Sequence, residues 1–282
     1  MVAEGVAARP GAHTLLANTL ICFVLVDPQS RHAFCSLYDV EPGPILGDGD
    51  SLTPEAMGAI GRSRALFING FIFDELSPGL IERVAVSAKE MGTVLMFDPG
   101  PRCLSIMAGA RPGREAMQRL IGISDVVLAT REEAAAISGR DDPHGCAEWV
   151  LQKSGSETKW CLVKMGEKGA ILHARHAPGP LLVRGVQVEV SDTVGCGDSF
   201  AAGVALGYIE GWDLEGALEL ANAVGAATAM GRGAGRNVAS TSDVLHILTD
   251  GRTGEARRSV ESALSLLRSS LEGSSLGVPT VG

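Results

Sequence analysis

A seven-residue string with an aspartate at each end is the clearest candidate for chemistry in this sequence. It spans residues 192–198 and reads DTVGCGD, and small residues that favour a helix follow it at once. Gly195 and Gly197 flank the small Cys196, so the backbone can turn tightly and direct successive N–H groups outward at a helix N-terminus, where anions bind. If the anion is a transferring phosphoryl group, Asp198 is placed to accept the proton of an attacking hydroxyl. The structural alternative is that Asp198 is only an acidic charge favoured by the helix dipole.

Other catalytic motifs have little support. The sequence has no H-E-x-x-H and no G-x-x-x-x-G-K-[ST], so a zincin or a P-loop enzyme lacks its motif. We expect His173 and His176 to be exposed near a strand hairpin rather than bound to a metal. A Rossmann oxidoreductase is a weak alternative, because no G-x-G-x-x-G follows an early strand.

Composition narrows the class of protein. A chain of 282 residues that is 45% hydrophobic and 20% charged can bury one large core and is not disordered. The net charge of −9, without clustered Lys or Arg, argues against a nucleic-acid partner. The six cysteines form no C-x-x-C pair, which indicates a reducing compartment. We therefore predict a cytoplasmic location and leave plastid or other organelle import open.

The elements that must position the string are short apolar strands alternating with helices. The pairs Thr53-Pro54 and Ser77-Pro78 are helix starts, with an N-cap followed by proline at the first helical position. Continuous apolar strands separated by helices indicate a three-layer α/β/α fold with a mostly parallel central sheet. We predict strands at 65–68, 93–97, 125–128 and 160–163, and after them helices at 199–210, 214–230, 244–249 and 255–271.

The beginning of the chain follows a different pattern. Residues 20–26 and 32–37 read as two strands joined by a turn, with no helix between them. The apolar run 15–26 is too short for a membrane span, and we expect it to be a buried strand. No membrane partner is predicted.

The string at 192–198 resembles the hallmark Asp-Thr-x-Gly-Ala-Gly-Asp of the ribokinase/PfkB family of carbohydrate and nucleoside kinases, with Cys196 in place of the usual alanine. A thiol at a helix N-terminus can become reactive. The resemblance implies a ribokinase-like fold and ATP-dependent transfer of a phosphoryl group to an alcohol of a sugar, cyclitol or nucleoside. It implies Asp198 as general base, residues 195–198 as the anion hole, and ATP and Mg²⁺ as cofactors, and it allows a monovalent cation.

Further segments extend the resemblance. Residues 163–170 look like the family's strand-loop-strand beside the nucleotide, although the same glycine spacing equally forms a hairpin turn. Residues 128–134 look like the family's Asn-x-x-Glu motif, with Thr130 in place of Asn and Glu133 as the glutamate. The alternative is that Glu133 is an ordinary acidic residue in the first turn of a helix. The alternative for Asn222 is a helix-surface amide. The resemblance assigns Lys164, Gly166, Lys168, Gly169, Asn222, Gly233 and Glu133 to the cofactor, with Glu133 reaching Mg²⁺ through water, and Asp98, Asn69 and Asp192 to the substrate side.

One departure from the family pattern concerns the first 45 residues. The family's acidic first strand and its Gly-Gly-x-x-x-Asn-x-Ala region do not occur there. We therefore expect residues 1–45 to be a remnant of the lid, 46–272 the kinase core and 273–282 a flexible tail. Two functions remain open: a kinase acting on a small-molecule acceptor, with a homodimer through lid strands as an option, or a catalytically impaired scaffold or truncated isoform.

Overall fold

The computed structural model describes residues 21–26, 32–37, 47–48, 51–153, 155–249 and 264–265. Most of the predicted helix 255–271 and the whole predicted tail lie outside these ranges. Leu264 is helical and packs against a buried cluster that includes Trp212 and Ile247. None of the described helices combines the length and apolarity needed to cross a bilayer.

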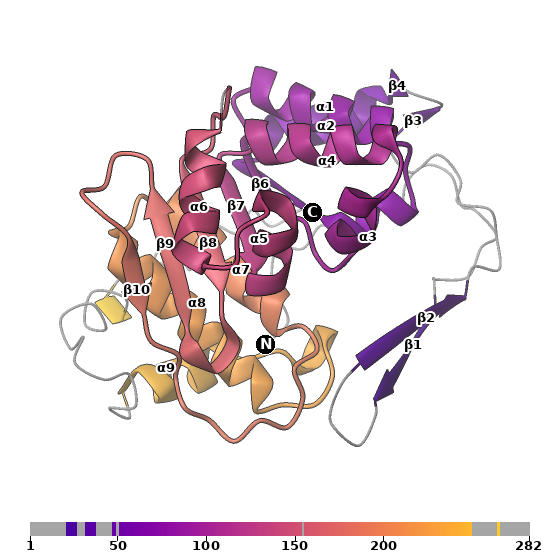
Figure 1. The fold of residues 1–282 in the computed structure, drawn as a ribbon. Helices are drawn as coiled ribbons and strands as arrows, with labels where there is room; N and C mark the ends of the chain where they lie inside the picture. Colours follow the sequence, from indigo (N-terminus) through magenta and orange to yellow (C-terminus); the bar gives the residue numbers. More distant parts are fainter. Residues whose placement is uncertain are drawn as a thin grey trace, which may run out of the picture.

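The central element is a six-stranded sheet in the order β10-β9-β8-β7-β6-β5 (Figure 1). The four strands β5 to β8 are parallel, and β9 and β10 are antiparallel additions at one side. All four predicted strands are confirmed to within one or two residues at each end. The strands are β5 (Ala65–Asn69), β6 (Val94–Asp98), β7 (Val126–Thr130), β8 (Trp160–Lys164), β9 (Ala170–Ala174) and β10 (Leu181–Val183).

Six helices pack against one face of the sheet. They bury alternate strand residues, including Leu95, Phe97 and Val127, in one large apolar cluster. The predicted helix starts are confirmed, because the Thr53 and Ser77 side chains accept hydrogen bonds from Ala56 and Leu80 backbone N–H groups. The helices are α1 (Pro54–Arg62), α2 (Pro78–Glu90), α3 (Arg102–Ala108), α4 (Arg111–Ile123), α5 (Arg131–Ser138) and α6 (Pro143–Gln152).

The opposite face is covered by α7 (Cys196–Ile209) and α8 (Leu214–Ala229), with α9 (Thr241–Thr249) packed outside them. Helices α7 and α8 approach closely, since a Cβ on Gly203 would lie 2.8 Å from the Ala221 Cα. The small residues after the aspartate string are therefore needed for helix contact. Because helices cover both faces of the sheet, the predicted three-layer α/β/α architecture is confirmed.

The predicted hairpin near the start of the chain is present, with β1 (Ile21–Val26) antiparallel to β2 (His32–Leu37). The expectation that the run 15–26 is a buried strand is wrong for the two residues whose exposure the structure describes, because Val24 is 39% exposed and Leu25 is 61% exposed. These strands form a separate two-stranded sheet (Figure 1), and a sheet of only two strands does not enclose its own apolar side chains. A second short pair, β3 (Gly47–Asp48) and β4 (Ser51–Leu52), precedes α1.

Candidate active site

The carboxyl ends of the parallel strands bring predicted site residues to one edge of the sheet, where ligands bind in open α/β folds. Asn69, Asp98, Thr130 and Lys164 are the last residues of β5, β6, β7 and β8. The Lys164 Nζ lies 2.5 Å from the Asp98 Oδ2, and only 14% of its side-chain surface is exposed. This ion pair spans from β6 to β8 over the intervening strand β7.

Asp98 has both carboxylate oxygens engaged. Its Oδ1 accepts a hydrogen bond from the Gly100 N–H at 3.0 Å, and its Oδ2 pairs with Lys164. The residue is 3% exposed. The buried carboxylate therefore holds the ammonium group in place, while the substrate contact predicted for Asp98 stays a prediction.

The N-terminus of α7 adjoins this ion pair. A Cβ on Gly197 would lie 3.7 Å from the Lys164 Nζ, which is van der Waals contact, so the ammonium group and the start of the helix are neighbours. Gly195 precedes the helix with φ of +82°, a left-handed conformation that favours glycine. The first hydrogen bond of the helix runs from the Ser199 N–H to the Gly195 carbonyl, so the amides of Gly197 and Asp198 precede the helical ladder and can bind an anion.

Asp192 fixes the shape of this loop. Its Oδ1 accepts from the Val194 N–H at 3.0 Å and its Oδ2 accepts from the Gly233 N–H at 2.8 Å. A Cβ on Gly195 would lie 3.2 Å from the Ala234 Cβ, so the two loops also touch. Gly233, predicted to contact the nucleotide, and Asp192, predicted to lie on the substrate side, are therefore in direct contact.

Asp198 lies in the first turn of α7 and is exposed. Its side chain makes no hydrogen bond or ion pair with any part of the chain that the structure describes. Partial desolvation and the negative charge of Asp98 raise the pKa of the Asp198 carboxyl, and the positive charge of Lys164 opposes the rise. A free carboxylate with a raised pKa is suited to accepting a proton.

Cys196 is not activated by its position at the helix N-terminus. Burial and the negative charge of Asp192 raise the pKa of its thiol, and the sulfur lies 3.8 Å from the Asp192 backbone carbonyl oxygen. A raised pKa does not favour a reactive thiolate at this position, and Cys196 is small enough to fit the turn.

Glu133 caps helix α5 and also interacts with the charges of Asp98 and Lys164. Its Oε2 accepts from the Thr130 N–H at 2.7 Å while the Thr130 hydroxyl accepts from the Glu133 N–H, which is a capping box. Burial and Asp98 raise the pKa of the Glu133 carboxyl, and Lys164 opposes this. The side chain is 6% exposed, whereas its neighbour Glu132 is exposed. Glu133, unlike Glu132, is thus buried and interacts with the charges of Asp98 and Lys164, while its role toward Mg²⁺ stays a prediction.

The turn between β8 and β9 contains the two glycines predicted to meet the nucleotide. Gly166 has φ of +59° and nothing within 4 Å of a Cβ, so its outer side is open. Gly169 has φ of +90°, and a Cβ there would lie 2.0 Å from the Val183 carbonyl oxygen. Gly169 is therefore required by packing against the end of β10. Lys168 is exposed between them in a short 3-10 helix (Gly166–Lys168).

Asn222 is not a helix-surface amide. It is 8% exposed, and its Nδ2 donates to the carbonyls of Val183 and Arg184 at 3.3 and 3.4 Å. The amide joins α8 to the end of β10, and its predicted contact with the nucleotide cofactor stays a prediction. Asn69 accepts a hydrogen bond from the Phe71 N–H and caps the short 3-10 helix Gly70–Asp74.

The pairing of Lys164 with Asp98 was not foreseen, although both residues were singled out. Each is a charged residue that ends an apolar strand. That shared position at a strand end is the signal from which their proximity could have been predicted. The described residues contain no cluster of three or more His, Cys, Asp or Glu side chains arranged to hold a metal ion directly.

Comparison with known proteins identifies the family to which this fold belongs. The sequence profile of the pfkB family carbohydrate kinases matches residues 19–241, and this chain belongs to that family. It is 34% identical over 173 residues to the ATP-dependent ribose-1-phosphate kinase of Halopiger xanaduensis, covering 61% of this chain and 52% of that protein. It is 30% identical over 139 residues to the 2-dehydro-3-deoxygluconokinase of Bacillus subtilis, covering 49% of this chain and 41% of that protein. The chain spans roughly half the length of these relatives.

Solved structures show the same fold. An E. coli protein crystallised with ATP and Mg²⁺ superposes with a TM-score of 0.68 at 20% identity, covering 83% of this chain and 72% of that chain. The ribokinase of Arabidopsis thaliana, solved with ribose and ATP, gives a TM-score of 0.64 at 18% identity, covering 81% of this chain and 68% of that chain. The ribokinase-like fold predicted from the sequence is confirmed.

Proposed function

We propose that this protein transfers the γ-phosphoryl group of ATP to an alcohol of a small sugar or sugar acid. The observation that carries the proposal is the unpartnered Asp198 carboxylate at the start of α7, beside the Lys164–Asp98 ion pair. The printed names of the two relatives above, a ribose-1-phosphate kinase and a 2-dehydro-3-deoxygluconokinase, favour a sugar-type acceptor over a nucleoside.

Asp198 acts as general base in this proposal. Its carboxylate accepts the proton of the attacking hydroxyl as the new oxygen–phosphorus bond forms and the bond to the leaving ADP oxygen breaks. The raised pKa of this carboxyl makes it a stronger base than an ordinary aspartate. The amides of Gly197 and Asp198, together with the positive end of α7, stabilise the negative charge on the transferring group.

Lys164 supplies the nearest positive charge. Its Nζ lies beside Gly197, and the buried Asp98 fixes its position. An ammonium group held in place before substrate arrives stabilises developing phosphoryl charge without reorganisation. Asp98 is then a positioning residue that acts through Lys164.

The residues present also fit a magnesium-bound nucleotide. The open face at Gly166 leaves room for a phosphate to approach the backbone. Mg²⁺ keeps several waters and is held by one or two carboxylates with substrate phosphates, so the absence of a three-ligand cluster among the described residues is compatible with Glu133 holding the ion through water. The ion, when bound, would supply charge neutralisation for the phosphates.

The proposal is tested by measuring ADP release with purified protein, Mg·ATP and a panel of sugars, sugar acids, sugar phosphates, cyclitols and nucleosides. We expect acceptor-dependent ADP release with at least one sugar-type compound. Release that depends only on a nucleoside would contradict the proposed acceptor class. ATP binding without acceptor-dependent turnover across the panel would contradict the proposed activity and favour a scaffold that retains the kinase fold.

A further inference from the structure

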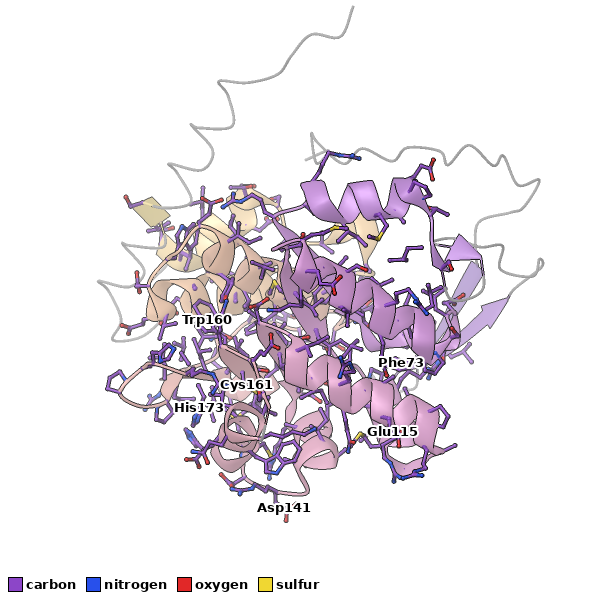
Figure 2. The ribbon with its side chains drawn as sticks, turned by 90° about the horizontal axis from the view of Figure 1, so that it is seen from above. Phe73, Glu115, Asp141, Trp160, Cys161 and His173 are labelled. Atoms are coloured by element: carbon purple, nitrogen blue, oxygen red, sulfur yellow. The ribbon has the colours of Figure 1, made fainter. Side chains whose placement is uncertain are left out.

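Two histidines far apart in the sequence meet where α6 lies against β9. The Nδ1 of His144 lies 3.3 Å from the Nε2 of His173, and the ring planes are inclined by 63° with centroids 5.5 Å apart. His144 is in the first turn of α6, and His173 pairs with Cys161 across β8 and β9 (Figure 2). Neither histidine belongs to the kinase site described above.

We propose that His144 and His173 form a two-histidine site for a divalent transition-metal ion of the Zn²⁺ type, which fastens α6 to β9. Imidazole nitrogens bind Zn²⁺ at about 2.0–2.1 Å. Two ligand atoms on one tetrahedral ion then lie about 3.3–3.4 Å apart. The separation of the two ring nitrogens, 3.3 Å, matches that spacing.

The alternative is an ordinary hydrogen bond between the two rings. A separation of 3.3 Å is also that of a long hydrogen bond, so the Zn²⁺ titration below is what distinguishes the two. In either case the two facing ring nitrogens lie close enough together to bind one ion. On binding, each facing nitrogen must present a lone pair, so the proton between the rings moves to the outer nitrogen of its own ring. Two nitrogen–metal bonds form and no electron is transferred.

The surroundings of the pair favour a cation. Glu148 follows His144 by four residues and therefore shares its face of α6, and the charges of Glu148 and Asp142 both act on His173.

The site is open to solvent on one side. His144 is exposed and His173 is half-buried, so an ion can enter without any rearrangement of the fold. The described residues offer no third protein ligand in position, and water would complete the coordination. The expectation that His176 is exposed is confirmed, whereas His173 is half-buried and paired.

A Zn²⁺ titration of the intact protein tests this inference. We expect isothermal titration calorimetry to find one saturable site in the wild type, and Zn²⁺ to raise its melting temperature. His144→Ala and His173→Ala should each weaken binding by at least about 10-fold, since one of two protein ligands is lost. The matched control is His176→Ala, which removes an exposed histidine near the same strand and should leave binding unchanged.

Loss of binding in a histidine variant is informative only if the variant is folded. Circular dichroism at 222 nm checks this for each variant, and the exposed His144 is the substitution expected to be tolerated. Co²⁺ provides a second readout, because nitrogen ligation gives a visible absorption that His144→Ala should abolish. The inference is overturned if the wild type shows no saturable Zn²⁺ site, or if His144→Ala and the wild type bind Zn²⁺ equally well, which would mean adventitious binding only.

Discussion

The Lys164 ammonium group and the Asp98 carboxylate form an ion pair of 2.5 Å between the ends of β8 and β6. The pair is mostly withdrawn from solvent, with 14% and 5% of the two side chains exposed. The nearby Asp198 and Glu133 carboxyls both respond to these two charges. The pair therefore sets the electrostatic environment of the candidate site.

Asp98→Asn should lower turnover and change its pH dependence. Removing the negative charge leaves Lys164 less firmly held, and we expect kcat to fall about 10–100-fold. Because Asp98 raises the pKa of Asp198, its removal lowers that pKa, and the acidic limb of the pH–rate profile moves to lower pH. The measurement is kcat against pH for both proteins. An unchanged acidic limb would show that Asp98 and Asp198 are not coupled.

Glu133→Gln should raise the Mg²⁺ concentration required for activity while preserving the fold. A glutamine can still accept the hydrogen bond from the Thr130 N–H, so the cap of α5 is retained. The lost charge weakens any water-mediated hold on the ion, and we expect the half-saturating Mg²⁺ concentration to rise several-fold. The matched control is the exposed Glu132→Gln, which should behave as wild type. Equal effects of the two substitutions would remove Glu133 from the site.

The buried Glu219 should make stability fall as pH rises. The residue is 3% exposed, and burial, assisted by Glu215, raises its pKa from 4.5 to about 7. The folded state therefore holds this proton more tightly than the unfolded state. The stabilisation is complete below about pH 4.5 and is lost as pH rises through about 7. Glu219→Gln should gain roughly 1–3 kcal/mol relative to wild type at pH 8.

Urea unfolding at pH 5.5 and pH 8 measures this difference. The exposed Glu215→Gln should produce a smaller change, because Glu215 is the secondary cause of the shift. A Glu219→Gln variant whose advantage over wild type is the same at both pH values would show that the carboxyl does not titrate in this range.

The two glycines of the β8–β9 turn should respond differently to alanine. Gly169→Ala forces a Cβ to within 2.0 Å of the Val183 carbonyl oxygen, and we expect a loss of about 2–4 kcal/mol in unfolding free energy. Gly166→Ala meets no neighbour and should cost only about 1–2 kcal/mol for its left-handed backbone. Instead, it should raise the KM for ATP, because its methyl group occupies the open face. The reverse ranking in a denaturation experiment would contradict this assignment.

The strands and helix starts were predictable because local signals determine them. The apolar run of β7 and the Ser77-Pro78 start of α2 need no distant partner to be recognised. The same applies to the loop ending at Asp198, whose two glycines and following small residues are specific to a tight turn into a closely packed helix.

What could not be predicted depends on contacts between distant segments. Asn222 is buried by the end of β10, 39 residues earlier in the chain, and the exposure of Leu25 depends on whether a second layer covers the hairpin. The Lys164–Asp98 pair joins residues 66 positions apart. Side-chain neighbours of this kind arise from the order of strands in the sheet, which apolar patterning alone does not specify.

The central claim is that Asp198 is the general base of phosphoryl transfer, and Asp198→Asn tests it most directly. The amide keeps the shape of the side chain but accepts a proton far less readily, so we expect acceptor-dependent ADP release to fall at least about 1,000-fold. ATP binding measured by calorimetry should stay within about 3-fold of wild type. Asp141→Asn, an exposed aspartate before α6, serves as the control and should retain full turnover. Undiminished turnover in Asp198→Asn would contradict the account.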